Sequence, residues 1–231
     1  MKNLLLFFAI TILFTNIVKS QDLGSFGADL GKKSVFGKEI RIPYTDLISF
    51  YGFMKPGITP DEEKGGKKYF YLYLWIPVAS PEIGIRMVSP VTDMKPEKGD
   101  FVMEEFTANQ TDKTSYFDTW ISFEKAGGVT SIDEILTKGK DAVWTSIMQN
   151  DDSGEMPKQP SGNYYNSLMR MTSEVSNPLK ALTIGLYRIG FTTYKTGEVK
   201  GSFLAQIGSV VKIPGMMVSR NLDTLKALIT K

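Results

Sequence analysis

The sequence has neither cysteine nor histidine among its 231 residues. Without cysteine there can be no disulfide, so the fold must depend on its hydrophobic core and on any bound ion. Without histidine, Ser-His-Asp and Cys-His nucleophiles are excluded, as are histidine-ligated zinc, copper and haem. The acid–base groups that remain are carboxylates, lysine and tyrosine. The metals compatible with such a chain are hard cations with oxygen ligands, calcium or magnesium.

An excess of charge of either sign is also missing. The chain has 27 basic and 25 acidic residues. If a leader containing Lys2 and Lys19 is removed, 27 minus two leaves 25 basic residues against 25 acidic ones. A balanced chain creates no basic field, and we expect no binding to nucleic acid.

The first 20 residues have the pattern of a signal peptide. A positive start at Lys2 precedes the apolar run from Leu4 to Phe14, and Val18 and Ser20 suit cleavage before Gln21. A retained membrane anchor is the alternative, but the run is short for a bilayer. No later stretch is long enough for a transmembrane helix. We therefore expect an exported protein that is secreted, periplasmic or on the outer-membrane surface.

The remaining chain is predicted to be mainly β. Residues 21–40 are rich in glycine and serine and should form a flexible arm, and residues 41–231 should form one β-sandwich domain. Apolar, strand-like segments recur between proline, glycine and aspartate breakers, and the last two are expected to pair with each other. These segments are Tyr69–Ile76, Ile83–Val88, Tyr116–Glu124, Ala142–Met148, Tyr165–Thr172, Ile184–Tyr194 and Ser202–Val211.

Few helices are expected, and those are short. Ser131 and Glu134 have the spacing of a capping box, which predicts a helix to about Lys138. Asn221 can cap a final helix over Leu222–Ile229, whose leucines recur on one face.

The most distinctive polar segment is the acidic turn at Asp151 and Asp152, which Gly154 follows. No lysine or arginine lies between Met148 and Pro157. Adjacent carboxylates without a local cation repel each other, and a divalent ion would relieve that repulsion. On the motif alone, a solvated acidic turn is the better interpretation, since the glycine comes too early for an EF-hand. Asp118, among aromatic residues, is likewise either a strand-end residue or a ligand.

Two other functions stay open on the residues alone. Tyr69, Tyr71 and Tyr73 could line a contact with a sugar or a protein, although ordinary sheet packing explains them equally well. The carboxylate groups at Glu104–Glu105 and Asp61–Glu63 could serve a carbohydrate-active enzyme. Solvated charged loops are the simpler explanation for these groups.

Six segments in order along the chain resemble one known family, the major surface lipoprotein of the spirochaete Leptospira and its relatives in marine bacteria. The longest of them, GLYRIGFTTYKTGEVKGSF, is also the most specific. The segments are Tyr51–Gly57, Tyr71–Pro77, Ile83–Pro90, Phe117–Ile121, Tyr165–Arg170 and Gly185–Phe203.

The resemblance implies a jelly-roll β-sandwich with a few peripheral helices and one calcium (Ca2+) site. By position, the family's calcium ligands fall on Asp118, Thr119, Asp151, Asp152 and Tyr165. Carboxylates from two segments, with carbonyl or hydroxyl oxygens, approach the six to eight oxygens that calcium prefers. With the resemblance, calcium binding becomes the favoured interpretation of the acidic turn.

The resemblance also implies adhesion or recognition at the cell surface, through extracellular-matrix proteins or surface glycans, and no enzymatic activity. A glycan-binding or carbohydrate-active protein is the alternative, and a structural envelope protein without a specific partner is a third. The sequence differs from the family pattern in having no cysteine for lipidation, a shorter acidic run and a shorter C-terminal tail. We accordingly expect no acyl anchor on this chain.

Overall fold

The computed structural model describes residue 23 and residues 25–231. The predicted signal peptide, residues 1–20, lies outside the described residues. Within them the chain forms thirteen strands and three short helices. The strands are β1 (Gly27–Val35), β2 (Lys38–Pro43), β3 (Asp46–Met54), β4 (Glu62–Lys64), β5 (Lys67–Ile76), β6 (Glu82–Val88), β7 (Phe101–Val102), β8 (Thr119–Ala126), β9 (Trp144–Asn150), β10 (Ser167–Thr172), β11 (Gly185–Thr193), β12 (Gly201–Ser209) and β13 (Met217–Ser219). The helices are α1 (Glu104–Ala108), α2 (Glu134–Thr137) and α3 (Leu222–Ile229).

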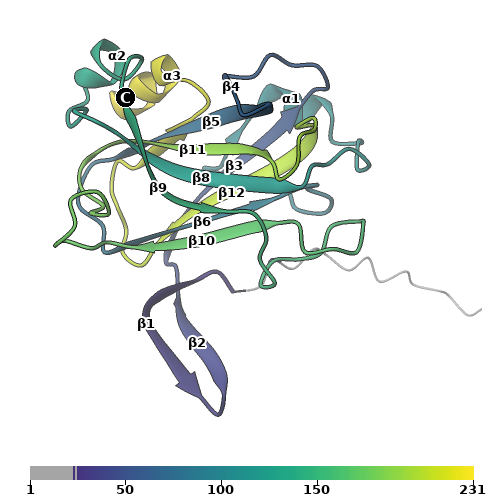
Figure 1. The fold of residues 1–231 in the computed structure, drawn as a ribbon, viewed down its shortest axis with the longest axis horizontal. Coiled ribbons are helices and arrows are strands. Elements are labelled where there is room, and N and C mark those ends of the chain that lie inside the picture. Colours follow the sequence, from purple (N-terminus) through teal and green to yellow (C-terminus); the bar gives the residue numbers. More distant parts are fainter. Residues whose placement is uncertain (1–22, 24) are drawn as a thin grey trace, which may run out of the picture.

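Two sheets form the body of the molecule (Figure 1). One has the strand order β10-β6-β12-β3-β7, and the other has the order β13-β5-β11-β8-β9, with β4 paired to β5. The chain passes back and forth between the sheets, as it does in jelly rolls. The predicted mainly β sandwich with a few short helices is confirmed.

The main hydrophobic core lies between the two sheets. It is rich in aromatic rings, and Phe191 packs against Phe70, Phe117 and Phe203 with centroid distances of 4.9 to 6.2 Å. Fully buried aromatic side chains contribute large apolar areas. This layer therefore makes a large contribution to the stability of a chain without disulfides.

Helices α2 and α3 pack together at one end of the molecule (Figure 1). Asn221 caps α3 as predicted, and its side-chain oxygen accepts a hydrogen bond from the Thr224 amide at 2.8 Å. The cap predicted at Ser131 is wrong, since the N-cap of α2 is Asp133 and makes no side-chain cap bond. Only half of the capping box forms, with the Glu134 carboxylate accepting from the Ser131 amide at 3.1 Å.

The pairing predicted for the last two long strands is also wrong. Strand β11 lies in the six-stranded sheet between β5 and β8, whereas β12 lies in the other sheet between β3 and β6. Glycine and threonine in the connection mark a change of direction, but they do not specify which sheet the chain enters next. Gly201 begins β12 with a φ of 97°, and an added Cβ would lie 1.9 Å from the Ser115 carbonyl oxygen.

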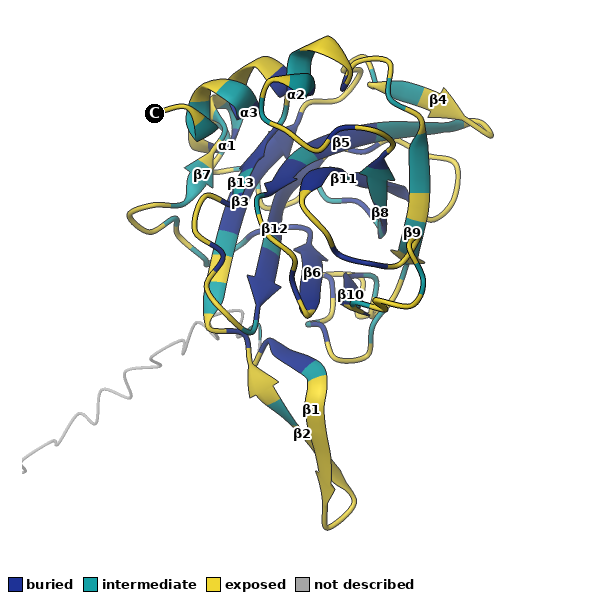
Figure 2. Ribbon diagram, turned by 90° about the vertical axis from the view of Figure 1, so that its left-hand side faces the viewer, coloured by how far each residue is buried: buried dark blue, intermediate teal, exposed yellow. Residues whose placement is uncertain are grey.

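Residues expected as a flexible arm contain a strand. Strands β1 and β2 form an antiparallel hairpin that projects from the body (Figure 1), and its outer part is exposed (Figure 2). Its base is fixed by Glu82, which is fully buried at the beginning of β6. The Glu82 carboxylate accepts hydrogen bonds from the amides of Asp29 and Leu30 at 2.9 and 2.7 Å. These long-range bonds are not visible in the local sequence.

The ring of Tyr44, just after β2, lies in a slot that two glycines create. Gly84 and Gly208 are directly opposite each other on β6 and β12, and a Cβ on either would approach the Tyr44 ring to 2.3 or 2.7 Å. The Tyr44 hydroxyl can then donate to Glu82 at 2.6 Å. The glycines are therefore needed for close approach of the ring to the sheet.

We expect Gly84→Ala to lower the free energy of unfolding by about 1–3 kcal/mol, because the tyrosine ring must move to admit the methyl group. Urea unfolding would measure the loss. Gly197→Ala is the matched control, since its nearest neighbour would be 3.5 Å away. Equal midpoints for the Gly84 variant and the unmodified protein would show that the slot is looser than the structure indicates.

Candidate metal centre

The five predicted calcium ligands lie at the ends of three strands. Asp118 directly precedes β8, whose first residue is Thr119, and Tyr165 comes two residues before β10. Asp151 and Asp152 directly follow β9. Strands β8 and β9 are antiparallel with Ile121 opposite Asn150, so the end of β9 meets the beginning of β8. The fold thus brings together residues that are distant in the sequence.

Hydrogen bonds through Thr119 hold these strand ends in place. The Thr119 amide donates to the Tyr165 carbonyl oxygen at 3.0 Å, and the Thr119 hydroxyl does so at 3.2 Å. The Ser167 hydroxyl lies 2.6 Å from the Thr119 carbonyl oxygen and 2.5 Å from that of Asp151. Thr119 and Ser167 are fully buried, so these bonds are protected from water.

Asp118 lies in an electrostatically unfavourable place. Burial raises the pKa of its carboxyl group to about 6, and the negative charges of Asp152 and Asp151 add to the shift. Lys195 and Lys67 act in the opposite direction. Its Oδ1 atom is buried and has no hydrogen-bond partner among the described residues. A buried acceptor without a partner carries a desolvation cost that a bound cation would remove.

Asp152 shares this environment. Burial and the charge of Asp151 both raise the pKa of the Asp152 carboxyl group. The side chain of Asp151 partly turns back, because its Oδ1 accepts a hydrogen bond from the Asp152 amide at 2.9 Å. The acidic turn and Asp118 therefore interact as one group of like charges, which a divalent cation would neutralise.

The arrangement is not a preassembled metal cluster. Within residues 23 and 25–231, no three acidic side chains come close enough to hold a metal ion as they stand. The Tyr165 carbonyl oxygen already accepts two hydrogen bonds from Thr119. The orphaned oxygen of Asp118 fits a hard cation, and the acidic turn would have to complete the site from its exposed loop.

Of the three tyrosines on β5, the middle one offers little free ring surface. Tyr71 is buried, and the Arg188 guanidinium lies 3.7 Å from its ring centroid and 4.4 Å from that of Trp144. Arg188 also forms an ion pair with Glu124 at 2.6 Å. The protein's own Arg188 thus lies over the rings of Tyr71 and Trp144, on which a sugar ring could otherwise stack.

The carboxylates considered for sugar chemistry have structural partners. Asp61 pairs with Arg220 at 2.7 Å, and the Tyr71 hydroxyl donates to Glu62 at 2.5 Å. Glu104 and Glu105 lie in the first turn of α1, where acidic residues suit the helix dipole.

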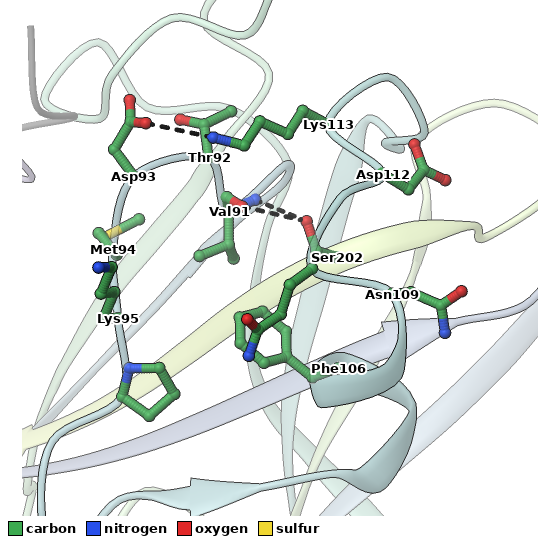
Figure 3. A pocket seen from close by; sticks show the side chains of 12 residues that line it. Val91, Thr92, Asp93, Met94, Lys95, Phe106, Asn109, Asp112, Lys113 and Ser202 are labelled. Carbon is green, nitrogen blue, oxygen red and sulfur yellow. Dashed lines mark hydrogen bonds and ion pairs between the residues drawn. The ribbon is translucent and has the colours of Figure 1, made fainter. Parts of the chain in front are cut away.

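A pocket of about 500 Å³ lies elsewhere, between the loop after β6 and the loop after α1 (Figure 3). No local pattern in the sequence indicates this pocket, because its lining comes from three separate segments. Phe106 contributes apolar surface, while Asp93 and Lys113 pair with each other at 3.5 Å. With Lys95 and Asp112 also in the lining, the pocket has two charges of each sign and no marked preference for either.

Comparison with known proteins agrees with the resemblance seen in the sequence. A family model described as a surface lipoprotein of the Spirochaetales order matches residues 38–218. The matched range includes all five predicted ligands. A comparison with curated proteins finds no match. In the part of the chain that the structure describes, no helix has the length and hydrophobicity needed to cross a membrane.

Proposed function

The chain belongs to the surface lipoproteins of the Spirochaetales order and is a cell-surface protein, and we propose that it binds one calcium ion at the candidate metal centre. The carboxylates of Asp118, Asp151 and Asp152 would hold the ion, and Thr119 and Tyr165 would supply further oxygens. The observation that carries the proposal is the buried Asp118 Oδ1, which has no hydrogen-bond partner in the described part of the chain and is influenced by the charges of two further aspartates.

Calcium at this place would have a structural role. It would supply the positive charge that the three carboxylates lack and would connect the exposed loop after β9 to the beginning of β8. A ligand that binds only the folded state stabilises it by mass action, by about 2.7 kcal/mol at a hundredfold excess over Kd. The loop at Asp152 would be ordered by the ion and would become mobile when the ion is removed.

Thermal unfolding with calcium and with excess chelator tests the proposal. We expect calcium to raise the Tm by several degrees, since about 1 kcal/mol shifts the Tm of a domain this size by about 2–4 °C. Asp151→Ala/Asp152→Ala should remove the rise. Asp133→Ala/Asp141→Ala removes the same charge from exposed positions and should keep it. Identical transitions with calcium and with chelator would mean that the acidic turn is only a solvated loop.

For the finer role we propose adhesion or recognition, with extracellular-matrix proteins or surface glycans as partners. The cell-surface location supports this role, because such proteins meet the environment directly. Solid-phase binding to a panel of matrix proteins and glycans, with calcium and with chelator, tests it. Binding to no member of the panel would favour a structural envelope protein instead.

A further inference from the structure

The tip of the β1–β2 hairpin has an unusual residue at a position that favours asparagine or glycine. Strand pairing ends at Val35 opposite Lys38, so the turn consists of Phe36 and Gly37 alone. Both have positive φ, 50° and 75°. Two-residue turns of this kind favour Asn-Gly, and a bulky residue with positive φ is strained. Phe36 is nevertheless fully exposed, at 103%. The strain therefore brings the fold no packing in return.

The two faces of the hairpin differ in charge pairing. On one face, Glu39 pairs with Lys32 at 3.2 Å and with Arg41 at 2.9 Å. Arg41 also pairs with Asp29 at 2.9 Å. Lys32 and Arg41 are thus balanced by Asp29 and Glu39 of the hairpin, and Arg41 also pairs with Glu155 outside it at 3.4 Å.

The opposite face combines apolar side chains with free cations. Directly opposite residues share a face, so Val35 and Lys38 lie together, as do Lys33 and Ile40. Val35 and Ile40 are exposed at 41% and 54%. Lys33 and Lys38 form no ion pair with any residue that the structure describes. This face and the turn present an apolar tip flanked by unpaired lysines.

We propose that this tip is a contact site for an anionic lipid bilayer. Exposed apolar side chains beside lysines match the boundary between acyl chains and negatively charged headgroups. Phe36 and Val35 would enter the bilayer, while Lys33 and Lys38 would lie among the headgroups. A second copy of the chain is a poorer occupant, because two such faces would bring like charges together. None of the proposed calcium ligands belongs to this tip, and contact with a lipid bilayer is a function in addition to calcium binding and adhesion.

Co-sedimentation with vesicles tests the proposal. Vesicles of phosphatidylglycerol are compared with vesicles of phosphatidylcholine, and chelator is present in every sample. Chelator separates this contact from the calcium site. We expect binding to the anionic vesicles only, with a loss of affinity as salt is raised. Lys33→Ala/Lys38→Ala should weaken binding about 25-fold, since each lysine near an anionic surface contributes about fivefold. Lys98→Ala/Lys140→Ala removes the same charge from exposed positions elsewhere and should bind normally.

Phe36→Asn separates folding from binding. Asparagine suits the turn, so the Tm should stay the same or rise, while vesicle affinity should fall about tenfold with the aromatic ring removed. Val175→Asn, at a position 92% exposed, is the control and should bind normally. Equal binding to both vesicle types, or full binding by Phe36→Asn, would overturn the proposal. The proposal would also be overturned if no vesicle binding is seen and the protein instead forms a dimer at higher concentration that Phe36→Asn dissociates.

Discussion

Glu82→Ala should lower the free energy of unfolding by about 3–5 kcal/mol, the largest loss that we expect from a single substitution in this protein. Its carboxylate is fully buried and accepts four hydrogen bonds. Two come from the hairpin amides of Asp29 and Leu30, one from the Tyr44 hydroxyl at 2.6 Å and one from the Thr172 hydroxyl at 3.0 Å. Alanine would remove the acceptor of all four donors together. The Tyr44 hydroxyl would be left buried without an acceptor, and the other three donors are part-buried, so each loss is costly.

The loss should appear first at the hairpin. Hydrogen exchange at the Asp29 and Leu30 amides should become much faster, and trypsin should cleave more readily after Lys32 and Lys33. The Tm should fall by about 10 °C. Glu82→Gln keeps one oxygen acceptor and should give an intermediate loss. Glu63→Ala, at an exposed position on β4, is the control and should leave the Tm unchanged. A Glu82→Ala protein with normal exchange at the hairpin would show that other contacts fix its base.

Glu82 also shows why the hairpin could not be predicted from the sequence. Residues 27–43 have weak periodicity, and their strands are stabilised by a residue about 50 positions further along the chain. Where a strand is mostly apolar, as β5 and β6 are, local pattern was enough to place it. Strand β4 consists of Glu-Glu-Lys and is defined only by its pairing with β5, so local pattern could not find it.

The candidate metal centre, too, could be predicted from the sequence only in part. The acidic turn at Asp151 and Asp152 was visible in the sequence as carboxylates without a local cation. Its proximity to Asp118 was implied by the family resemblance alone, because it depends on the register of β8 against β9. The buried Ser167, which lies against both Thr119 and Asp151, gave no sequence signal at all. Its role depends on packing between strands from the two sheets.

The candidate metal centre and the hairpin are also connected through one cluster of charges. Glu155, in the loop after the acidic turn, pairs with Arg170 at 2.8 Å and with Arg41 of β2 at 3.4 Å. Arg170 in turn donates to the Gly27 carbonyl oxygen at 2.6 Å. The loop that would be ordered by calcium is therefore in direct contact with the base of the projecting hairpin.

Asp118→Asn should have opposite effects with and without calcium. In chelator, the substitution removes a partly buried negative charge next to Asp151 and Asp152, and we expect a gain in stability of about 1 kcal/mol after solvent screening is allowed for. In saturating calcium, the neutral amide is a weaker ligand, and most of the stabilisation of about 2.7 kcal/mol at a hundredfold excess over Kd should be lost. The variant should thus have a higher Tm than the unmodified protein in chelator and a lower Tm in calcium.

Asp112→Asn is the matched control for this reversal. Hydrogen bonds from the Ser115 and Thr114 amides lower the pKa of the Asp112 carboxyl group to about 2, so its negative charge is favourable in the folded state. Its removal should lower the Tm equally in calcium and in chelator. If Asp118→Asn instead lowers the Tm in chelator, the Asp118 charge stabilises the fold through Lys195 and Lys67, and the case for a cation at this position fails. A reversal seen only at Asp118 would mean that the fold tolerates an unfavourable carboxylate because calcium binding requires it.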